Sequence, residues 1–133
     1  MNPMAAPRQT VGVVDDEPEM RKALRRLLAC RGFQVQEYER GADLLLDPTA
    51  SHRLDCLLLD LHMEGVSGFE VLESFLTRQI HVPVIVITAH DEPGTEGRVR
   101  GLGAVAYLKK PVDRDALLSA IAEALAHHAT TSP

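Results

Sequence analysis

The hydrophobic positions of this 133-residue chain fall into short apolar runs and stretches of helical periodicity. One run, Leu57-Leu58-Leu59-Asp60, has no polar alternation and ends abruptly on a carboxylate. Strands that are buried on both faces have this pattern. Similar runs occur at Val11–Val14, Val82–Thr88 and Val105–Leu108, whereas Phe33–Tyr38 alternates apolar and polar residues, as an edge strand does. The pattern therefore predicts five strands.

Helical periodicity fills the segments between these strands. Pro18 suits the first turn of a helix that ends near Gly32. Its apolar residues recur at i, i+3, i+4, i+7 and i+8: Met20, Ala23, Leu24, Leu27 and Leu28. A short helix is expected over Gly41–Leu46. The segment Asp91–Gly103 contains four glycines and a proline, so we expect any helix there to be marginal and the segment to be mobile.

Two further helices have recognisable N-caps. Ser67 is expected to cap a helix that carries Phe69, Leu72 and Leu76 on its apolar stripe, with Val71 and Phe75 beside it. Asp113 is expected to cap the last helix, which frays from His127. The inner stripe of that helix consists of Leu117, Ala120, Ile121, Ala124 and Leu125.

Strands that alternate with helices predict a parallel sheet with right-handed crossovers. We therefore expect an α/β fold, a doubly wound five-stranded parallel sheet in the flavodoxin-like order 2-1-3-4-5, with helices on both faces. In this order ligands collect at the carboxyl ends of the first and third strands, where the winding reverses. Asp15, Asp16 and Asp60 are expected to meet at that edge.

The composition narrows the class of protein. The length suits one domain, which we expect over residues 10–127, between a flexible arm (1–9) and a tail or linker (128–133). A net charge of -5 argues against direct nucleic-acid binding. The longest apolar run is too short for a membrane helix, and no signal peptide is visible, so we expect a cytoplasmic protein. Cys30 and Cys56 are expected to be reduced and buried.

The residues at the strand ends suggest phosphoryl chemistry. Three converging carboxylates repel one another unless a cation compensates them, and a few oxygen ligands with room for water favour Mg²⁺ over Ca²⁺. Thr88 supplies a hydroxyl and Lys110 an ammonium at neighbouring strand ends, and both groups bind phosphoryl oxygens. Asp60 is then the candidate nucleophile, because a carboxylate can attack phosphorus to form an acyl phosphate.

These motifs together resemble the receiver domain of two-component response regulators, the CheY-like superfamily. The motifs are Val13-Val14-Asp15-Asp16-Glu17, Leu58-Leu59-Asp60-Leu61-His62-Met63 with Gly65 and Gly68, Ile87-Thr88-Ala89, and Tyr107-Leu108-Lys109-Lys110-Pro111. The resemblance spans about Thr10 to His127. Around Leu61–Gly68 the sequence is most similar to receivers of LuxR-type transcriptional regulators.

The resemblance implies a role for each matching residue. Asp60 matches the acceptor of a phosphoryl group from a sensor histidine kinase or a phosphotransfer protein. Asp16 matches the direct Mg²⁺ ligand, Asp15 the acid that holds the metal through water, and the backbone carbonyl of His62 a third metal contact. Lys110 matches the family's active-site lysine, which is expected to precede a cis proline bond.

The resemblance also implies a switch. Thr88 matches the hydroxyl that moves onto the phosphate, and Tyr107 the aromatic residue that changes rotamer with it. The surface of Asp91–Gly103, the fifth strand and the last helix would report phosphorylation. That surface, or one formed by the first and last helices, could support a homodimer. The chain would catalyse only its own phosphorylation and autodephosphorylation, so it is not a conventional enzyme.

The chain also departs from the pattern of many relatives. Glu64 replaces a proline after Met63, which adds a negative charge near the acidic pocket. His62 and His90 stand two residues beyond Asp60 and Thr88, where family members tune the lifetime of the phosphate. We therefore expect both histidines to affect dephosphorylation.

Several alternatives use similar residues. A haloacid-dehalogenase-like phosphatase also has an Asp nucleophile and Mg²⁺, but it needs a second acid where this chain has His62. Nucleotide binding is not supported, because the sequence has neither a G-x-G-x-x-G motif after the first strand nor a P-loop lysine motif. The intact acidic site argues against an unphosphorylated adaptor. Control of transcription through an output domain outside this chain and a stand-alone receiver in a phosphorelay both remain open.

Overall fold

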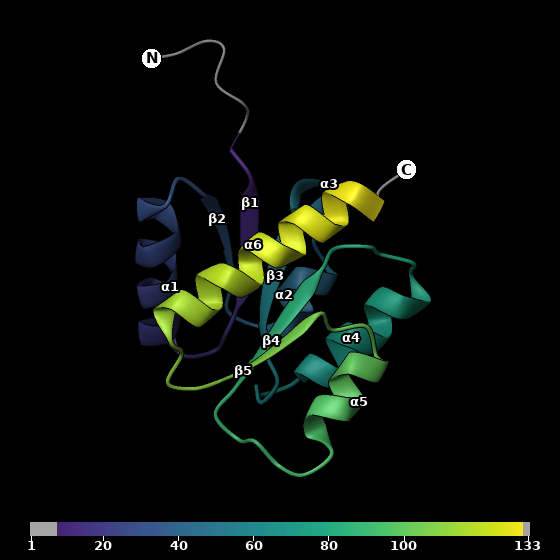
Figure 1. The fold of residues 1–133 in the computed structure, drawn as a ribbon. Helices are drawn as coiled ribbons and strands as arrows, with labels where there is room; N and C mark the ends of the chain where they lie inside the picture. Colours follow the sequence, from purple (N-terminus) through teal and green to yellow (C-terminus); the bar gives the residue numbers. More distant parts are fainter. Residues whose placement is uncertain (1–7, 132–133) are drawn as a thin grey trace.

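The computed structural model describes residues 8–131, with side chains through residue 127. Five parallel strands form one sheet in the order β2-β1-β3-β4-β5 (Figure 1). The strands are β1 (Thr10–Val14), β2 (Gln34–Tyr38), β3 (Cys56–Asp60), β4 (Val84–Thr88) and β5 (Ala106–Lys109). The predicted fold class and strand order are confirmed. Most of the expected N-terminal arm and the side chains of the expected tail lie outside the described residues.

Helices cover both faces of the sheet. They are α1 (Pro18–Cys30), α2 (Gly41–Leu45), α3 (Ala50–Arg53), α4 (Gly68–Thr77), α5 (Thr95–Gly101) and α6 (Arg114–Thr131). Residues of α1 and α6 pack on one face, and residues of α2, α4 and α5 pack on the other. Figure 1 shows α6 crossing in front of the sheet, with α1 at the left and α4 and α5 at the lower right. Asp113 caps α6 as expected, because its Oδ2 accepts a hydrogen bond of 2.9 Å from the backbone of Ala116.

The central strand β3 divides the hydrophobic core into two clusters. Successive side chains of a strand point to opposite faces. Leu57 and Leu59 accordingly pack in the cluster that contains α2 and α4 residues, whereas Cys56 and Leu58 pack in the cluster that contains α1 and α6 residues. Every residue of β3 is buried. Because both faces of this strand are packed, its end is held rigidly at the edge of the sheet.

The apolar face of α4 differs from the prediction. Leu76 was expected on the inner stripe, but its side chain is 53% exposed. The buried residues of this helix are Gly68, Val71, Leu72 and Phe75. The inward face is therefore centred between Val71 and Leu72, because α4 begins at Gly68 and its N-terminus packs closely on the end of β3.

Other elements also differ from the expectations. The glycine-rich segment forms α5 over Thr95–Gly101, where buried Val99 packs on the sheet. The short helix α3 was not predicted. Helix α6 continues past His127 to Thr131. Cys56 is buried as expected, but Cys30 is exposed because it stands at the C-terminal end of α1, away from that helix's buried face.

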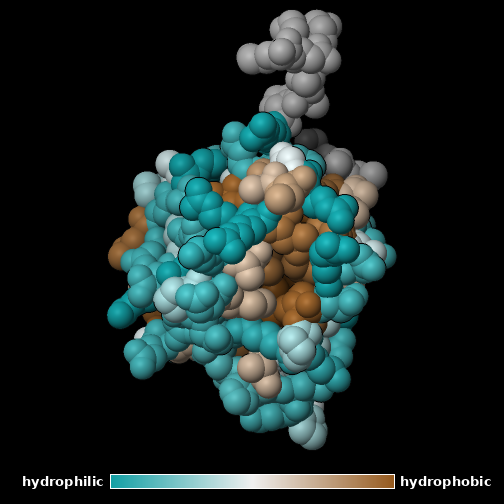
Figure 2. Space-filling view, turned by 90° about the vertical axis from the view of Figure 1, so that its left-hand side faces the viewer, coloured by the Kyte–Doolittle hydropathy of each residue, from teal (hydrophilic) through white to brown (hydrophobic). Residues whose placement is uncertain are grey.

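Strand β2 forms one edge of the sheet and is less buried than β1 and β3. Figure 2 shows the side of the molecule that lies on the left in Figure 1, where hydrophilic residues surround a hydrophobic hollow.

Among the described residues, no helix is both long and apolar enough to span a membrane.

Candidate functional site

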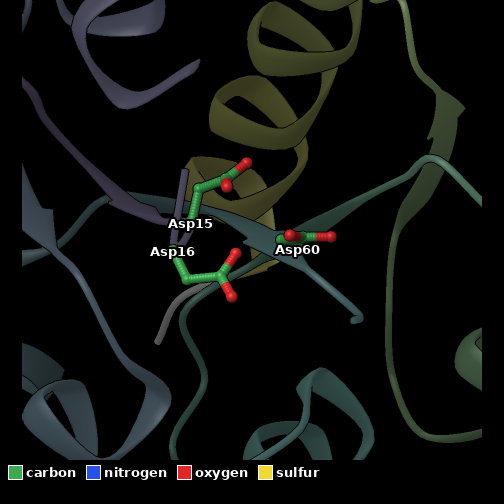
Figure 3. A group of neighbouring side chains, drawn as sticks. All are labelled: Asp15, Asp16 and Asp60. Carbon is green, nitrogen blue, oxygen red and sulfur yellow. The ribbon is translucent and has the colours of Figure 1, made fainter. Parts of the chain in front are cut away.

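Three carboxylates gather at the carboxyl edge of the sheet. Asp15 and Asp16 follow β1, and Asp60 ends β3, which is the neighbouring strand. One oxygen from each residue lies within 4.8 Å of the others (Figure 3). Asp15 and Asp60 are only 2% and 4% exposed. The structure therefore brings together the three acids that the sequence predicts to meet.

Backbone groups orient two of these acids. The backbone N–H of Glu17 donates to Asp15 Oδ1 at 2.9 Å, and the guanidinium of Arg21 donates to the Asp15 carbonyl at 2.6 Å. The backbone N–H of His62 donates to Asp60 Oδ1 at 3.3 Å. These hydrogen bonds involve Oδ1 of each carboxylate, so Oδ2 of Asp15 and Oδ2 of Asp60 face the rest of the cluster.

Lys110 reaches into the acidic cluster from the end of β5. Its Nζ lies 3.0 Å from Asp15 Oδ2, 3.2 Å from Glu17 Oε1 and 3.6 Å from Asp60 Oδ2. The Lys110–Pro111 peptide bond is cis, as the resemblance implied. Glu17 was not predicted as a partner of this lysine. Its place directly after the acid pair was the only available signal, and that position also suits a helix N-terminus.

The electrostatics of the cluster favour an added cation. Burial, followed by the charge of Asp15, raises the pKa of Asp60 to about 6, although Lys110 opposes the shift. Burial acts to lower the pKa of Lys110, but hydrogen bonding and charge from Asp15 and Asp60 raise it overall. One lysine thus leaves the ionised acids incompletely compensated. An all-oxygen donor set of this kind fits a hard divalent ion such as Mg²⁺.

The N-terminus of α4 packs directly behind Asp60. A Cβ atom on Gly68 would lie 2.6 Å from the Asp60 carbonyl oxygen and 2.7 Å from Leu61 Cα. Ser67 caps the helix with the expected geometry, because its hydroxyl accepts from the backbone of Glu70 while the Glu70 side chain accepts from the backbone of Ser67. The absence of a side chain at Gly68 allows α4 to approach the phosphoacceptor candidate.

Thr88 ends β4, beside β3. Asp60 pairs with Ile87 in the sheet, so Thr88 is the next residue along the neighbouring strand. Its side chain is fully buried, and its Oγ1 exchanges hydrogen bonds with the backbone of His90, accepting at 3.1 Å and donating at 3.3 Å. Tyr107 lies on β5, and its hydroxyl donates to Asp91 Oδ1 at 2.8 Å.

The two candidate lifetime residues contact each other. The His62 and His90 rings have centroids 5.0 Å apart and are nearly perpendicular, at 88°. Both residues are exposed, as is Glu64. The sequence placed these histidines beyond two different strand ends, and the structure brings their rings together.

A family model described as the response regulator receiver domain matches residues 11–122. The chain is 36% identical over 121 residues to the DNA-binding transcriptional regulator NtrC of Escherichia coli, a match that covers 91% of this chain and 26% of NtrC. It is 33% identical to the transcriptional regulatory protein FixJ of Azorhizobium caulinodans, covering 90% of this chain and 56% of FixJ. The chain thus spans between a quarter and just over half of these relatives.

A comparison of structures agrees with the family match. The response regulator StyR has a TM-score of 0.86 with this chain at 35% identity, over 93% of this chain and 62% of the StyR chain.

Proposed function

Because the chain belongs to the response regulator receiver domain family, we propose that Asp60 is the residue that accepts a phosphoryl group, from a histidine kinase or a phosphotransfer protein. The observation that carries this proposal is the position of Asp60. It is nearly buried at the end of the central strand, beside two other acids, with the Lys110 ammonium 3.6 Å from its Oδ2. In such a site Asp60 can meet a phosphoryl group, Lys110 supplies positive charge, and the other two acids can hold a cation that compensates the remaining negative charge.

The proposed reaction is a displacement at phosphorus. An oxygen of Asp60 forms the new P–O bond, the P–N bond to the donor imidazole breaks, and that nitrogen keeps the bonding electron pair and then takes a proton from solvent. Lys110 holds positive charge beside the attacking oxygen. Thr88 donates its hydroxyl hydrogen to a phosphoryl oxygen after transfer. Lys110 and Thr88 thus stabilise the negative charge on the phosphoryl oxygens.

Asp15, Asp16 and Asp60, with the backbone carbonyl of His62, would hold Mg²⁺. When bound, this ion supplies charge compensation for the phosphoryl oxygens. The short separation of the three carboxylates and the raised pKa of Asp60 support this assignment. By the resemblance to the family, Asp16 would bind the ion directly and Asp15 would hold it through water.

The proposed output is a change at the surface formed by α5, β5 and α6. Thr88 and Tyr107 would transmit the change, and this surface or the one formed by α1 and α6 would support a homodimer. The two curated relatives are transcriptional regulators, and this supports control of transcription through an output domain outside this chain. A stand-alone receiver in a phosphorelay is the second candidate.

The remaining assignments are part of the same proposal. The receiver spans residues 10–127, between an arm (1–9) and a tail or linker (128–133). The net charge of -5 supports an absence of direct DNA binding by this chain. We assign it to the cytoplasm, away from the membrane. His62 and His90 would modulate the lifetime of the phosphate.

Beryllofluoride, which mimics a bound phosphoryl group, provides the test. We expect it to shift amide NMR signals of the loops after β3 and β4 only when Mg²⁺ is present. Asp60→Asn should abolish the shifts, whereas Glu73→Gln, on the exposed face of α4, should retain them. Shifts that persist in Asp60→Asn would refute the assignment of Asp60.

A further inference from the structure

Asp91 joins the loop after β4 to strand β5. One of its carboxylate oxygens, Oδ1, accepts a hydrogen bond of 2.8 Å from the Tyr107 hydroxyl. The other, Oδ2, lies 3.1 Å from Nζ of Lys109. Tyr107 and Lys109 are two residues apart on β5, so their side chains leave the same face of the strand. One carboxylate therefore pairs with two neighbouring side chains of β5.

The same loop is also tied to Thr88. The Thr88 hydroxyl accepts from the His90 N–H and donates to the His90 carbonyl. A hydroxyl has a single hydrogen to donate. Thr88 therefore cannot donate to a phosphoryl oxygen while it keeps its bond to the His90 carbonyl. Movement of Thr88 onto a phosphoryl group would release the residue directly before Asp91.

The orientation of Tyr107 is consistent with a connection from Thr88 through the loop after β4 to Tyr107. Its hydroxyl meets an exposed carboxylate, so the polar end of the side chain lies at the surface. Asp91 contributes to a pKa of about 12 for Tyr107, after burial as the first cause. The carboxylate accepts the phenolic hydrogen, so the bond forms only with the neutral phenol.

We propose that Asp91 is a positioning residue that holds Tyr107 in its outward orientation in the unphosphorylated protein and connects this orientation to Thr88 through the backbone of His90. The proposal rests on the proposed function, in which Thr88 and Tyr107 form the switch. When the Thr88 hydroxyl leaves the His90 backbone, the loop that carries Asp91 is released, and Tyr107 loses its surface partner. Asp91 thus favours the inactive state.

A ligand of the active state binds more tightly when the inactive state is destabilised. Removing the carboxylate charge with Asp91→Asn should therefore increase the affinity for beryllofluoride, in the presence of Mg²⁺, by about threefold to tenfold. Asp91→Asn leaves a neutral, weaker acceptor for the Tyr107 hydroxyl, whereas Tyr107→Phe removes the hydrogen bond altogether and should also increase the affinity. A purely structural role for Asp91 would leave this affinity unchanged or lower it.

Tyrosine NMR tests the orientation without any ligand. The chain has only two tyrosines, Tyr38 and Tyr107, and the Tyr38 hydroxyl donates to Asp47 at 2.6 Å. In metal-free protein labelled with ¹³C-tyrosine, Asp91→Asn should lower the pKa of Tyr107 and change its side-chain couplings, with Tyr38 unaffected. The matched control Asp47→Asn should affect Tyr38 alone.

The two experiments separate this proposal from the proposed function. Asp60-dependent beryllofluoride binding that is equally strong in wild type and Asp91→Asn would overturn the role of Asp91 and leave that of Asp60 intact. Unchanged Tyr107 couplings in ligand-free Asp91→Asn would also overturn it. Beryllofluoride binding that does not depend on Asp60 would instead count against the proposed function, while the ligand-free spectra would still decide whether Asp91 orients Tyr107.

Discussion

At the scale of single residues, the site contains ionisable groups whose burial would destabilise the folded protein if they had no partners. Asp15 and Asp60 are nearly buried carboxylates, and Lys110 is shared among three acids. An acid whose pKa is raised by burial destabilises the folded state when it is ionised. The arrangement of the site therefore has a measurable effect on the stability of the metal-free protein.

Asp60→Asn should stabilise the metal-free protein at neutral pH. The pKa of Asp60 is raised from 3.8 to about 6, so the folded state loses stability as pH rises from the unfolded value through the folded one. Replacement with a neutral amide removes this loss, worth up to about 3 kcal/mol at pH 7. The difference should vanish well below the unfolded pKa of 3.8, where the carboxyl is protonated in both states.

Urea unfolding in EDTA measures this effect. The exposed carboxylate in Glu73→Gln serves as a control and should change stability by less than about 0.5 kcal/mol. A metal-free Asp60→Asn protein that is less stable than wild type at pH 7 would contradict the electrostatic account of the site.

In the proposed function, His62 and His90 modulate the lifetime of the phosphate. The rings of His62 and His90 lie against each other beyond Asp60 and Thr88, where they can obstruct water. His62→Ala and His90→Ala should therefore each accelerate the decay of the radiolabelled phosphoprotein by about twofold or more, because hydrolysis needs a positioned water. His81 precedes β4, at the end of that strand opposite to Thr88, so His81→Ala should not change the rate of decay. Unchanged decay in both site variants would contradict this role.

At the scale of the elements, the position of Asp60 depends on how α4 packs on the end of β3. Gly68 begins α4, and the Ser67 capping box fixes the start of the helix. The close approach of Gly68 to the Asp60 carbonyl leaves no space for a side chain. The packing of α4 is therefore connected directly to the geometry of the candidate site around Asp60.

Gly68→Ala should destabilise the protein by about 1–3 kcal/mol, because its Cβ would contact backbone atoms that must move. It should also weaken beryllofluoride binding, because the displaced backbone carries Asp60. Gly97→Ala, inside α5, is the matched control. A Cβ there meets nothing within 4 Å, so this change should be neutral or stabilising by up to about 1 kcal/mol. Equal effects of the two changes in urea unfolding would argue against the packing constraint.

The elements also show which parts of the structure were predictable. Buried parallel strands and capped helices leave strong local patterns, so the five strands and the cap at Ser67 follow from the sequence. The strand order does not follow from local patterns, and its prediction depended on the resemblance to a known family. The exposure of Leu76 does not follow from the sequence, because apolar periodicity alone does not determine which residue lies at the centre of the inward face of α4. Helix α5 forms despite its glycines because Val99 is buried against the sheet, and tertiary packing outweighs weak propensity.

The site was predictable to the extent that its residues lie at strand ends. Parallel topology brings Asp15, Asp16 and Asp60 to one edge, and it adds Thr88 and Lys110 from the two neighbouring strands. The contacts of Glu17 with Lys110 and of Asp91 with Tyr107 depend on side-chain directions in loops. No periodicity encodes those directions, so only the structure reveals these contacts.

At the scale of the whole molecule, the sheet places chemistry at one edge and the proposed output surface on one side. Asp60 ends the central strand β3. Thr88 ends the neighbouring strand β4, and Tyr107 lies on β5, which is the next strand in the sheet. The connection from site to surface is therefore short and runs through neighbouring strands. In the proposed function, phosphorylation of Asp60 changes the surface of α5, β5 and α6 along this short connection while the core stays folded.

The most direct test of the central claim is to locate the phosphoryl group. The protein is incubated with Mg²⁺ and acetyl phosphate, the acyl phosphate is reduced with borohydride to homoserine, and peptide mass spectrometry finds the modified residue. We predict modification at Asp60, and loss of labelling in EDTA and in Asp60→Asn. Labelling at another residue, or labelling that persists in Asp60→Asn, would contradict the account.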